Sequence, residues 1–339
     1  NGINYYQKVP FTNNAGSDII NMLYFNSNKL RYHSMSVLQT YVRDVNLYKL
    51  YYNSPQSLAE GDTAFIICIQ AHLKAGSTQA DAVDRDTMTL RIMRSLAKMN
   101  TPDNYLIMGD FNIYSANENA YRNLVNNTNE NIRFYDPINK PGDWNNNSYF
   151  APYHTQSTTT VSDCKSGGGL DDRFDFILVS NDIITGSKKV KYIDNSYKTI
   201  GNDGLHYNTS INASPQNNSV PAAVLNALFV NSDHLPVVLD LKVSTSSAVN
   251  ENIVLSPFNN LSVRNIGSNA LTFSFAAQQP VNFNLQIVNI LGQPLISKEL
   301  KAEKGENAYT IDVGSLSKGF YFVSLTDGFR KVTFKVVLK

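Results

Sequence analysis

Four stretches of the sequence place polar side chains capable of acid–base chemistry beside an apolar run. These side chains are His72, Asp110 with Asn112, Asp172 with Asp175, and Asp233 with His234. Neighbouring strands of a central sheet present their ends at one edge, so we expect these side chains to converge. Carboxylates and an amide suit a hard divalent cation, and a histidine is then left for proton transfer. With only five histidines in the chain, Mg²⁺ is the expected cofactor rather than zinc, and Mn²⁺ and Ca²⁺ are the alternatives.

Each stretch also has an ordinary structural interpretation. A single histidine at the end of a strand is most often a hydrogen-bonded structural residue. Asp110-Phe111-Asn112 follows a glycine and is typical of a turn, because Asp and Asn side chains bond to the nearby backbone. Positions two apart lie on the same side of a strand, which would bring Asp110 and Asn112 together. The interpretation as a site therefore depends on all four stretches meeting in space.

The elements that would position these residues alternate between strands and helices. Apolar or alternating runs predict strands at 21–27, 45–53, 63–73, 105–108, 173–180 and 235–243. Helical spacing of apolar residues predicts helices at 77–100 and 116–125, capped by Ser77 or Thr78 and by Ser115. This order indicates an α/β layered domain whose site is built on loops.

Composition limits the class of protein. The 339 residues carry a net charge of +1, with 42% hydrophobic and 17% charged residues, as in a globular protein with one large and one small domain. Overall charge gives no argument for a polyanionic partner, so a nucleic-acid enzyme would need a local basic groove. No apolar run reaches 18 residues, so no transmembrane segment is expected. We expect a monomer, and Cys68 and Cys164 allow either one disulfide or two free thiols.

The motifs resemble those of a known superfamily. "IQAHLK" (69–74), "NYLIMGDFN" (104–112), "DDRFDFILVS" (171–180) and "SDHLPV" (232–237) occur in the order typical of the endonuclease/exonuclease/phosphatase superfamily. The resemblance covers residues 1–243 and implies the deoxyribonuclease-I-like fold, a four-layer α/β/β/α sandwich. It also implies hydrolysis of phosphoesters with Mg²⁺ or a similar ion.

The resemblance implies a catalytic role for five residues. Asp110 and Asn112 would position or activate the attacking water and contact the phosphate. Asp175 would orient His234, and His72 would be the second histidine of the nuclease branch. These roles agree with the needs of phosphoryl transfer, which are in-line attack and neutralisation of charge on the phosphoryl oxygens.

The resemblance accounts for the metal ligands only in part. Asp233 and Asp110 would bind the cation, but the family also has an early strand that ends in a metal-binding glutamate. The first glutamate here is Glu60, in a polar loop, and residues 1–30 resemble the part of the family just after that strand. We therefore expect that an N-terminal piece of the catalytic domain is missing from this sequence.

The polar stretch at 139–160 is the expected place of substrate contact, because recognition residues are often carried by long loops. Tyr153, His154 and Gln156 are the candidates there, and aromatic rings could stack on bases. A solvated loop with a packed tyrosine is the alternative. Arg173 is a further candidate, through contact with phosphate, and a salt bridge to Asp171 or Asp172 is its alternative.

Residues 253–339 follow a polar linker at 244–252 and differ from the rest in pattern. Strand-like runs at 285–300 and 319–339, joined by turns at glycines, predict a small β-sandwich. "LQIVNILGQPL", "IDVGSLSKGFYFVSLTDG" and "FRKVTFKVVLK" resemble the type A sorting domain of type IX secretion in Bacteroidetes. This resemblance implies export by the type IX machinery, followed by release or surface attachment. An oxidising exterior would favour a disulfide between the two cysteines. A generic adhesion or carbohydrate-binding module is the alternative.

Together these expectations describe a secreted, metal-dependent endonuclease that hydrolyses DNA or RNA through an activated water. Two alternatives stay open from the sequence. One is a sphingomyelinase-like lipid phosphodiesterase on the same fold, and the other is a non-catalytic surface-binding protein.

Overall fold

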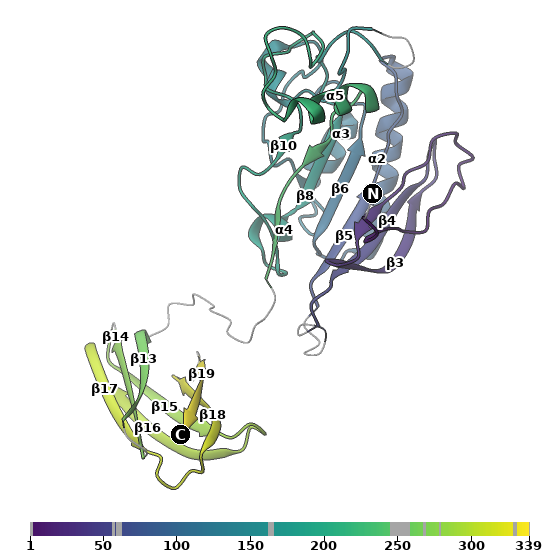
Figure 1. Cartoon of the computed structure of the whole chain (residues 1–339). Coiled ribbons are helices and arrows are strands. Elements are labelled where there is room, and N and C mark those ends of the chain that lie inside the picture. Colours follow the sequence, from purple (N-terminus) through teal and green to yellow (C-terminus); the bar gives the residue numbers. More distant parts are fainter. Residues whose placement is uncertain are drawn as a thin grey trace. The chain divides into compact units, whose positions relative to one another are not determined.

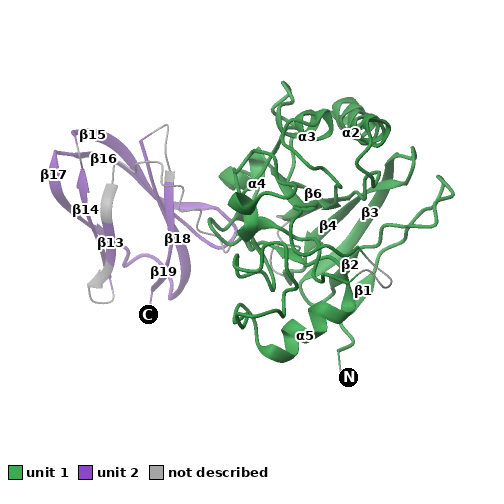
Figure 2. Ribbon diagram, turned by 90° about the horizontal axis from the view of Figure 1, so that it is seen from above, with its two compact units in different colours: residues 1–245 green, residues 246–339 purple. Residues whose placement is uncertain are grey.

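The computed structural model describes residues 3–55, 58, 63–161, 166–244, 258–266, 269–277, 279–327 and 331–338. The chain divides into two compact units, residues 1–245 and 246–339, which Figure 2 shows in different colours. Glu60, Cys164 and most of the expected linker lie outside the described residues. Cys68 is a buried free thiol, and burial raises the pKa of its thiol to about 12. No helix in the described ranges is long and apolar enough to cross a membrane.

The first unit is organised around a six-stranded sheet with the strand order β3-β4-β5-β6-β8-β7. Its strands are Leu30–Gln39 (β3), Val45–Tyr52 (β4), Phe65–Gln70 (β5), Tyr105–Asp110 (β6), Phe134–Tyr135 (β7) and Asp175–Ser180 (β8). β5 and β6 are parallel, whereas the other neighbours are antiparallel. Because a parallel pair needs a long crossover, the chain between them forms helix α2 (Gln79–Met99), which lies along the sheet in Figure 1.

Helix α2 begins and ends as the sequence predicts. Thr78 is its N-cap, and the Thr78 hydroxyl accepts from the backbone of Asp81 while the Asp81 carboxylate accepts from the backbone of Thr78. Helix α3 (Asn119–Val125) begins later than predicted, after Glu118. The predicted cap Ser115 is wrong, because its hydroxyl instead accepts from Asn117 N in the preceding turn.

The two faces of the sheet pack against different layers. In Figure 2, α2 and α3 lie on one side of the sheet, and β1 (Tyr6–Lys8), β2 (Tyr24–Asn26) and α5 (Ala222–Asn231) lie on the other. Neighbours on β6 point to opposite faces, so Ile107 joins the core under the helices and Leu106 joins the core on the other side. The strand is thus buried on both faces, as its continuous apolar run indicates.

The second sheet of the predicted four-layer sandwich is not formed as a continuous sheet by the described residues. Opposite the helices they form three two-stranded pieces. These pieces pair β1 with β2, β9 (Val190–Tyr192) with β12 (Leu241–Val243), and β10 (Lys198–Thr199) with β11 (Val237–Val238). The predicted strand at 235–243 is therefore divided in two, and each half pairs with a different partner. Two short helical segments, α4 (Asn181–Thr185) and the 3₁₀ helix η1 (Ser148–Tyr153), complete the unit.

The C-terminal unit consists of two antiparallel sheets, ordered β13-β14-β17 and β16-β15-β18-β19. Their strands are Phe258–Ile266 (β13), Ala270–Ala277 (β14), Val281–Val288 (β15), Pro294–Ala302 (β16), Gly305–Asp312 (β17), Gly319–Thr326 (β18) and Lys331–Leu338 (β19). Alternate residues such as Phe273, Leu285 and Val323 are fully buried and form one shared core. The facing sheets therefore make a small β-sandwich.

Candidate active site

The ends of β5, β6 and β8 bring together His72, Asp110, Asp175 and His234. Asp110 and Asp175 are paired residues on the antiparallel strands β6 and β8. His72 Nε2 lies 3.3 Å from Asp110 Oδ2, and His234 Nε2 lies 4.0 Å from the same oxygen. His234 Nδ1 lies 2.8 Å from Asp175 Oδ2. Residues from four separate stretches of the sequence thus form one polar cluster, which we call the His–Asp cluster.

A buried polar segment, residues 154–159, holds His234 and Asp175 in place. Gln156 forms isolated bridges with both His234 and Asp172, and its side-chain Nε2 lies 3.0 Å from His234 Nε2. The Thr155 hydroxyl accepts from the backbone N–H groups of Phe174 and Asp175. The segment therefore fixes the start of β8 against the chain that carries His234.

Burial and charge set the protonation of the cluster. Burial, and next the charge of Asp175, raises the pKa of Asp110 to about 7. Burial opposes the charged form of His234, but the hydrogen bond to Asp175 and the charges of Asp175 and Asp110 outweigh it and raise its pKa to about 9. Burial, together with the charges of Arg43 and His234, lowers the pKa of His72 to about 4. At neutral pH the cluster therefore contains one imidazolium, His234, and one neutral imidazole, His72.

The turn after β6 depends on two backbone conformations. Gly109 has φ 137°, and a Cβ atom there would lie 2.1 Å from the carbonyl oxygen of Ala71, so only glycine fits. Asn112 has φ 50°, a left-handed conformation that asparagine tolerates. Its backbone N–H donates to Asp110 Oδ1 at 2.9 Å, and its side chain donates to Leu73 O at 3.4 Å. Asn112 is 6% exposed, so in this structure it holds Asp110 rather than facing an open surface.

The predicted metal ligands are not gathered into a cation site. The carboxylate of Asp233 accepts from the backbone N–H of Ser166 at 2.9 Å. Over the described residues, no group of three or more His, Cys, Asp and Glu side chains is arranged to hold a metal ion. Mg²⁺ demands near-octahedral oxygen ligands, whereas the groups around the Asp110 carboxylate are two imidazoles, Asn112 and a single further carboxylate, Asp175. The described residues alone do not fit Mg²⁺, and the ligand roles of Asp110 and Asp233 stay predictions.

Two residues predicted to contact the substrate lie in the interior, and these predictions are wrong. Arg173 is 1% exposed, and its Nη1 and Nη2 atoms lie 2.8 and 2.9 Å from the two carboxylate oxygens of Asp136. The predicted alternative partners, Asp171 and Asp172, are not the ones used. His154 is fully buried, and its Nε2 donates to Trp144 O at 2.8 Å. The Nη atoms of Arg173 and the Nε2 atom of His154 thus have their partners inside the protein, which is what allows polar side chains to be buried.

Two further residues are Tyr153, which was predicted to contact the substrate, and Arg43, which was not predicted. Tyr153 is half-buried and packs against the core under the helices, and its contact with substrate stays a prediction. The sequence analysis did not single out Arg43, which is 9% exposed. Its Nη1 donates to the carbonyl oxygens of Leu73 at 2.6 Å and His72 at 3.3 Å. Arg43 thus fixes the loop that carries His72. The only feature of the sequence that could have indicated this role is the Arg43-Asp44 pair between two predicted strands.

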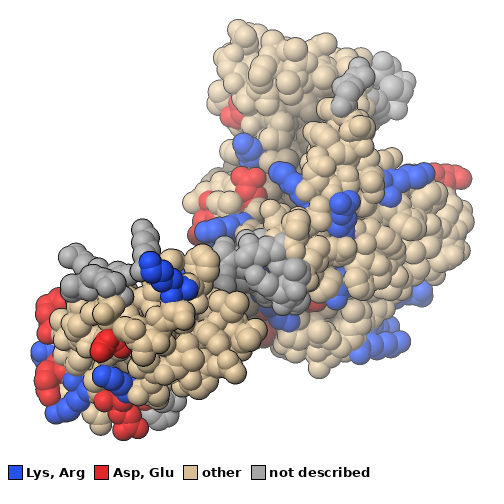
Figure 3. All heavy atoms as spheres, turned by 60° about the horizontal axis from the view of Figure 1, so that its bottom comes forward, with Lys and Arg blue, Asp and Glu red and all other residues tan. Residues whose placement is uncertain are grey.

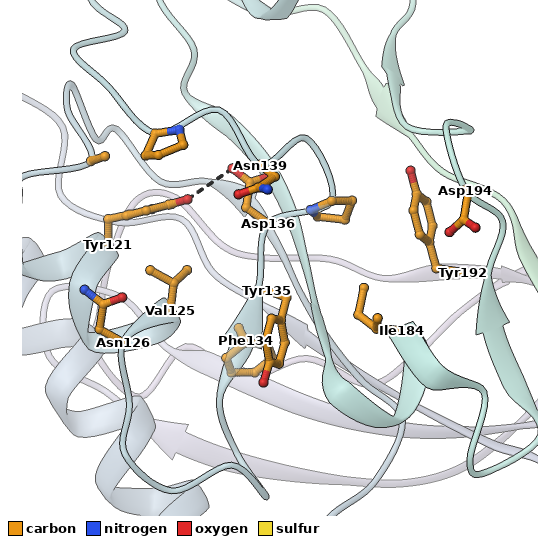
Figure 4. Close-up of a pocket in the computed structure, with 13 residues that line it drawn as sticks. Tyr121, Val125, Asn126, Phe134, Tyr135, Asp136, Asn139, Ile184, Tyr192 and Asp194 are labelled. Atoms are coloured by element: carbon orange, nitrogen blue, oxygen red, sulfur yellow. Dashed lines mark hydrogen bonds between the residues drawn. The ribbon is translucent and has the colours of Figure 1, made fainter.

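A separate pocket of about 540 Å³ lies between α3, β7, α4 and β9. Figure 4 shows Tyr121 and Asp136 on one side of it and Tyr192 and Asp194 on the other. The dashed line in Figure 4 is the hydrogen bond from the Tyr121 hydroxyl to Asp136, 3.1 Å long. None of the residues of the His–Asp cluster lines this pocket.

Residues 267–339 match the family described as a secretion system C-terminal sorting domain. This confirms the predicted sorting domain, and the C-terminal unit marks the chain for type IX export to the cell surface or the exterior. No curated protein matches the chain.

Three solved structures illustrate the likeness of the chain to endonuclease/exonuclease/phosphatase proteins. TDP2 from D. rerio, complexed with a single-strand DNA product, is 12% identical over 70% of this chain and 78% of its own, with a TM-score of 0.42. The human Nocturnin catalytic domain with a bound sulfate is 13% identical over 71% and 73%, with a TM-score of 0.40. A family protein from Bacteroides thetaiotaomicron is 14% identical over 71% and 74%, with a TM-score of 0.38. At these scores the function has to be argued from the contacts within this chain.

Replacement of Gly109 by alanine is expected to unfold the turn that carries Asp110. The added Cβ would meet the Ala71 carbonyl oxygen at 2.1 Å, in addition to the cost of a positive φ. Gly168→Ala is the matched control, because Gly168 has φ 119° but nothing within 4 Å of the added atom. The control should lose about 1–3 kcal/mol for backbone strain alone, and Gly109→Ala should lose clearly more. Urea unfolding of both variants measures the difference, and equal losses would contradict the role of the close approach.

NMR titration of the imidazoles should find His234 protonated and His72 neutral at neutral pH. Asp175→Asn should lower the pKa of His234, because its hydrogen bond and charge are lost. A raised pKa in the folded state stabilises the fold fully below the unfolded value of about 6.5 and loses this effect as pH rises through about 9. The stability difference between wild type and Asp175→Asn should therefore shrink between these pH values. A constant difference over this range would show that Asp175 does not set the protonation of His234.

Proposed function

We propose that the first unit hydrolyses phosphodiester bonds. The observation that carries the proposal is the contact of His234 with Asp175, at 2.8 Å, on the side of the ring opposite to Asp110. A carboxylate on Nδ1 fixes the tautomer and orientation of an imidazole and leaves Nε2 for the reacting group. Asp110 and His234 together offer a proton acceptor and a positive charge within one small volume, as hydrolysis of a phosphoester requires.

In the proposed reaction a water attacks phosphorus in line with the leaving oxygen. The bond from the water oxygen to phosphorus forms while the ester P–O bond breaks. Asp110 accepts the proton of the water. The imidazolium of His234 neutralises charge on the phosphoryl oxygens and donates its Nε2 proton to the leaving oxygen. Asp175 positions His234, and Asn112 positions Asp110 through its backbone N–H.

Nucleic acid, either DNA or RNA, is our proposed substrate class. The polar stretch expected to contact substrate exposes one aromatic ring, Tyr149 on η1, which is 71% exposed and can stack on a base. On the face shown in Figure 3, basic and acidic side chains of the described residues are interspersed and form no extended basic patch. On that face, contact with the phosphate backbone would therefore be local.

A lipid phosphodiester is the second candidate, because an exposed apolar side chain is carried by a loop that contacts η1. Leu205 is 72% exposed and belongs to a loop that rests on η1. The Asn202 side chain donates to the carbonyl oxygens of Ala151 and His154, and Gly204 packs against Pro152. Incubation with plasmid DNA, RNA and sphingomyelin in parallel distinguishes the candidates, since Leu205→Ser should impair only cleavage of the lipid.

His234→Ala is expected to reduce phosphodiester cleavage by roughly 10²–10⁴-fold, because it removes the proposed charge and proton donor. Its thermal transition should fall, because the contacts of His234 with Asp175 and Asp110 are lost, so cleavage is compared at a temperature where both proteins are folded. The matched control is His33→Ala, which removes an exposed histidine from β3. A folded His234→Ala variant with wild-type cleavage would refute the assigned role.

Mg²⁺ is expected to bind this chain weakly. The described residues supply no complete set of oxygen ligands, so calorimetric titration should show no saturation at micromolar concentrations of Mg²⁺. Asp110→Asn should abolish whatever binding is found, because it removes a carboxylate charge. Tight, micromolar binding by the wild type would show that the ligands assemble differently from this structure. Cleavage assays with EDTA and with added Mg²⁺ or Mn²⁺ then report whether the reaction needs the ion.

A further inference from the structure

The exposed apolar side chains of the C-terminal unit gather at one end of its four-stranded sheet. In the described part of this unit, the large hydrophobic side chains exposed to solvent are Ile290, Leu291, Leu295, Phe320, Phe322 and Val337. We call this set the apolar end. Isolated exposed hydrophobics are common on proteins, but a contiguous group of this kind marks an interaction surface.

Strand register explains how these residues come together. Tyr321 and Val323 point into the core of the sandwich, so the alternation of β18 turns Phe320 and Phe322 outward. Phe320 pairs with Val337 on β19, and Phe322 pairs with Val288 on β15. Ile290 and Leu291 form the turn that joins β15 to β16, immediately beyond Val288.

The exposure of these residues is not needed for the fold. Leu291 is 81% exposed and Phe320 is 53% exposed. Leu291 is held in its turn, and Phe320 in its strand pairing, through backbone groups, so a polar residue could occupy either position. The core of the unit is complete without them, since it is formed by the inward residues of both sheets. Two phenylalanines and a leucine at such positions therefore indicate contact with something outside the unit.

Charge indicates what kind of partner fits. Lys335 Nζ lies 4.1 Å from the centre of the Phe320 ring, and the exposed Lys318 precedes β18 directly. The described carboxylates of this sheet and its turns, Glu299, Glu303 and Asp327, lie toward the other end, where Asn284 pairs with Glu299 and Thr326. The complementary surface is thus apolar and bordered by carboxylates.

We propose that the apolar end is the surface by which the sorting domain binds a protein of the type IX export machinery, and that this protein presents an apolar patch bordered by carboxylates. The match of residues 267–339 to a secretion sorting domain supplies the class of partner, and the structure supplies the surface. The proposal does not depend on the phosphodiesterase function of the first unit.

Export of the full chain from a bacterium with a type IX system tests the proposal. The fraction found outside the cell, against the fraction retained in the periplasm, is measured by immunoblotting and needs no enzymatic activity. Leu291→Glu and Phe320→Glu should each reduce export by about tenfold, because each places a carboxylate in an apolar contact with an acidic border. Leu291→Lys should be exported better than Leu291→Glu, since a cation complements that border.

Asn282→Glu is the matched control, because it adds the same charge to an exposed position at the opposite end of β15. The thermal transitions of the purified variants check that they fold, and little change is expected at Leu291. Normal export of both Leu291→Glu and Phe320→Glu would overturn the proposal. Two further assays ask whether the purified wild type binds anionic phospholipid vesicles or dimerises in sedimentation. The proposal would also be overturned if Leu291→Glu abolishes either association and leaves export unchanged.

Discussion

The first unit depends on the pairing of two carboxylates, Asp110 and Asp175, at the ends of adjacent strands. Both are largely shielded from water, and like charges so placed repel each other. A positive charge beside them relieves this repulsion, and His234 supplies it through its contacts with Asp175 and Asp110. The conformation of the chain around residues 232–236 is therefore tied to the central sheet by electrostatics as well as by packing.

The residues that hold the His–Asp cluster in place come from segments whose sequences do not by themselves indicate this role. Gln156 and Thr155 belong to a polar stretch that is buried because its backbone and side chains bond to β8 and to His234. Arg43 binds the carbonyl oxygens of the loop that carries His72. Replacement of any of these would shift a charged group within a buried network, where geometry has large energetic consequences.

The proposed catalytic site and the export signal lie in different units of the chain. The proposed phosphodiesterase site lies within residues 1–245, whereas the export signal and the apolar end lie in the C-terminal sandwich. Each has its own core, so substitutions in one should leave the folding of the other unchanged. Export and hydrolysis can therefore be tested independently in the full chain.

The sequence by itself determined the buried strands β5 and β6, helix α2 with a cap at Ser77 or Thr78, and the sorting domain. These follow from hydrophobic periodicity, capping residues and motifs, which act over a few neighbouring positions. It also pointed to His72, Asp110, Asp175 and His234, because polar residues at strand ends are local features. Only the tertiary structure decided that Arg173 and His154 are interior residues, that Arg43 and Gln156 support the site, and that the second sheet is divided into short pieces. Burial and hydrogen-bond partners depend on contacts between distant parts of the chain, and no local pattern encodes them.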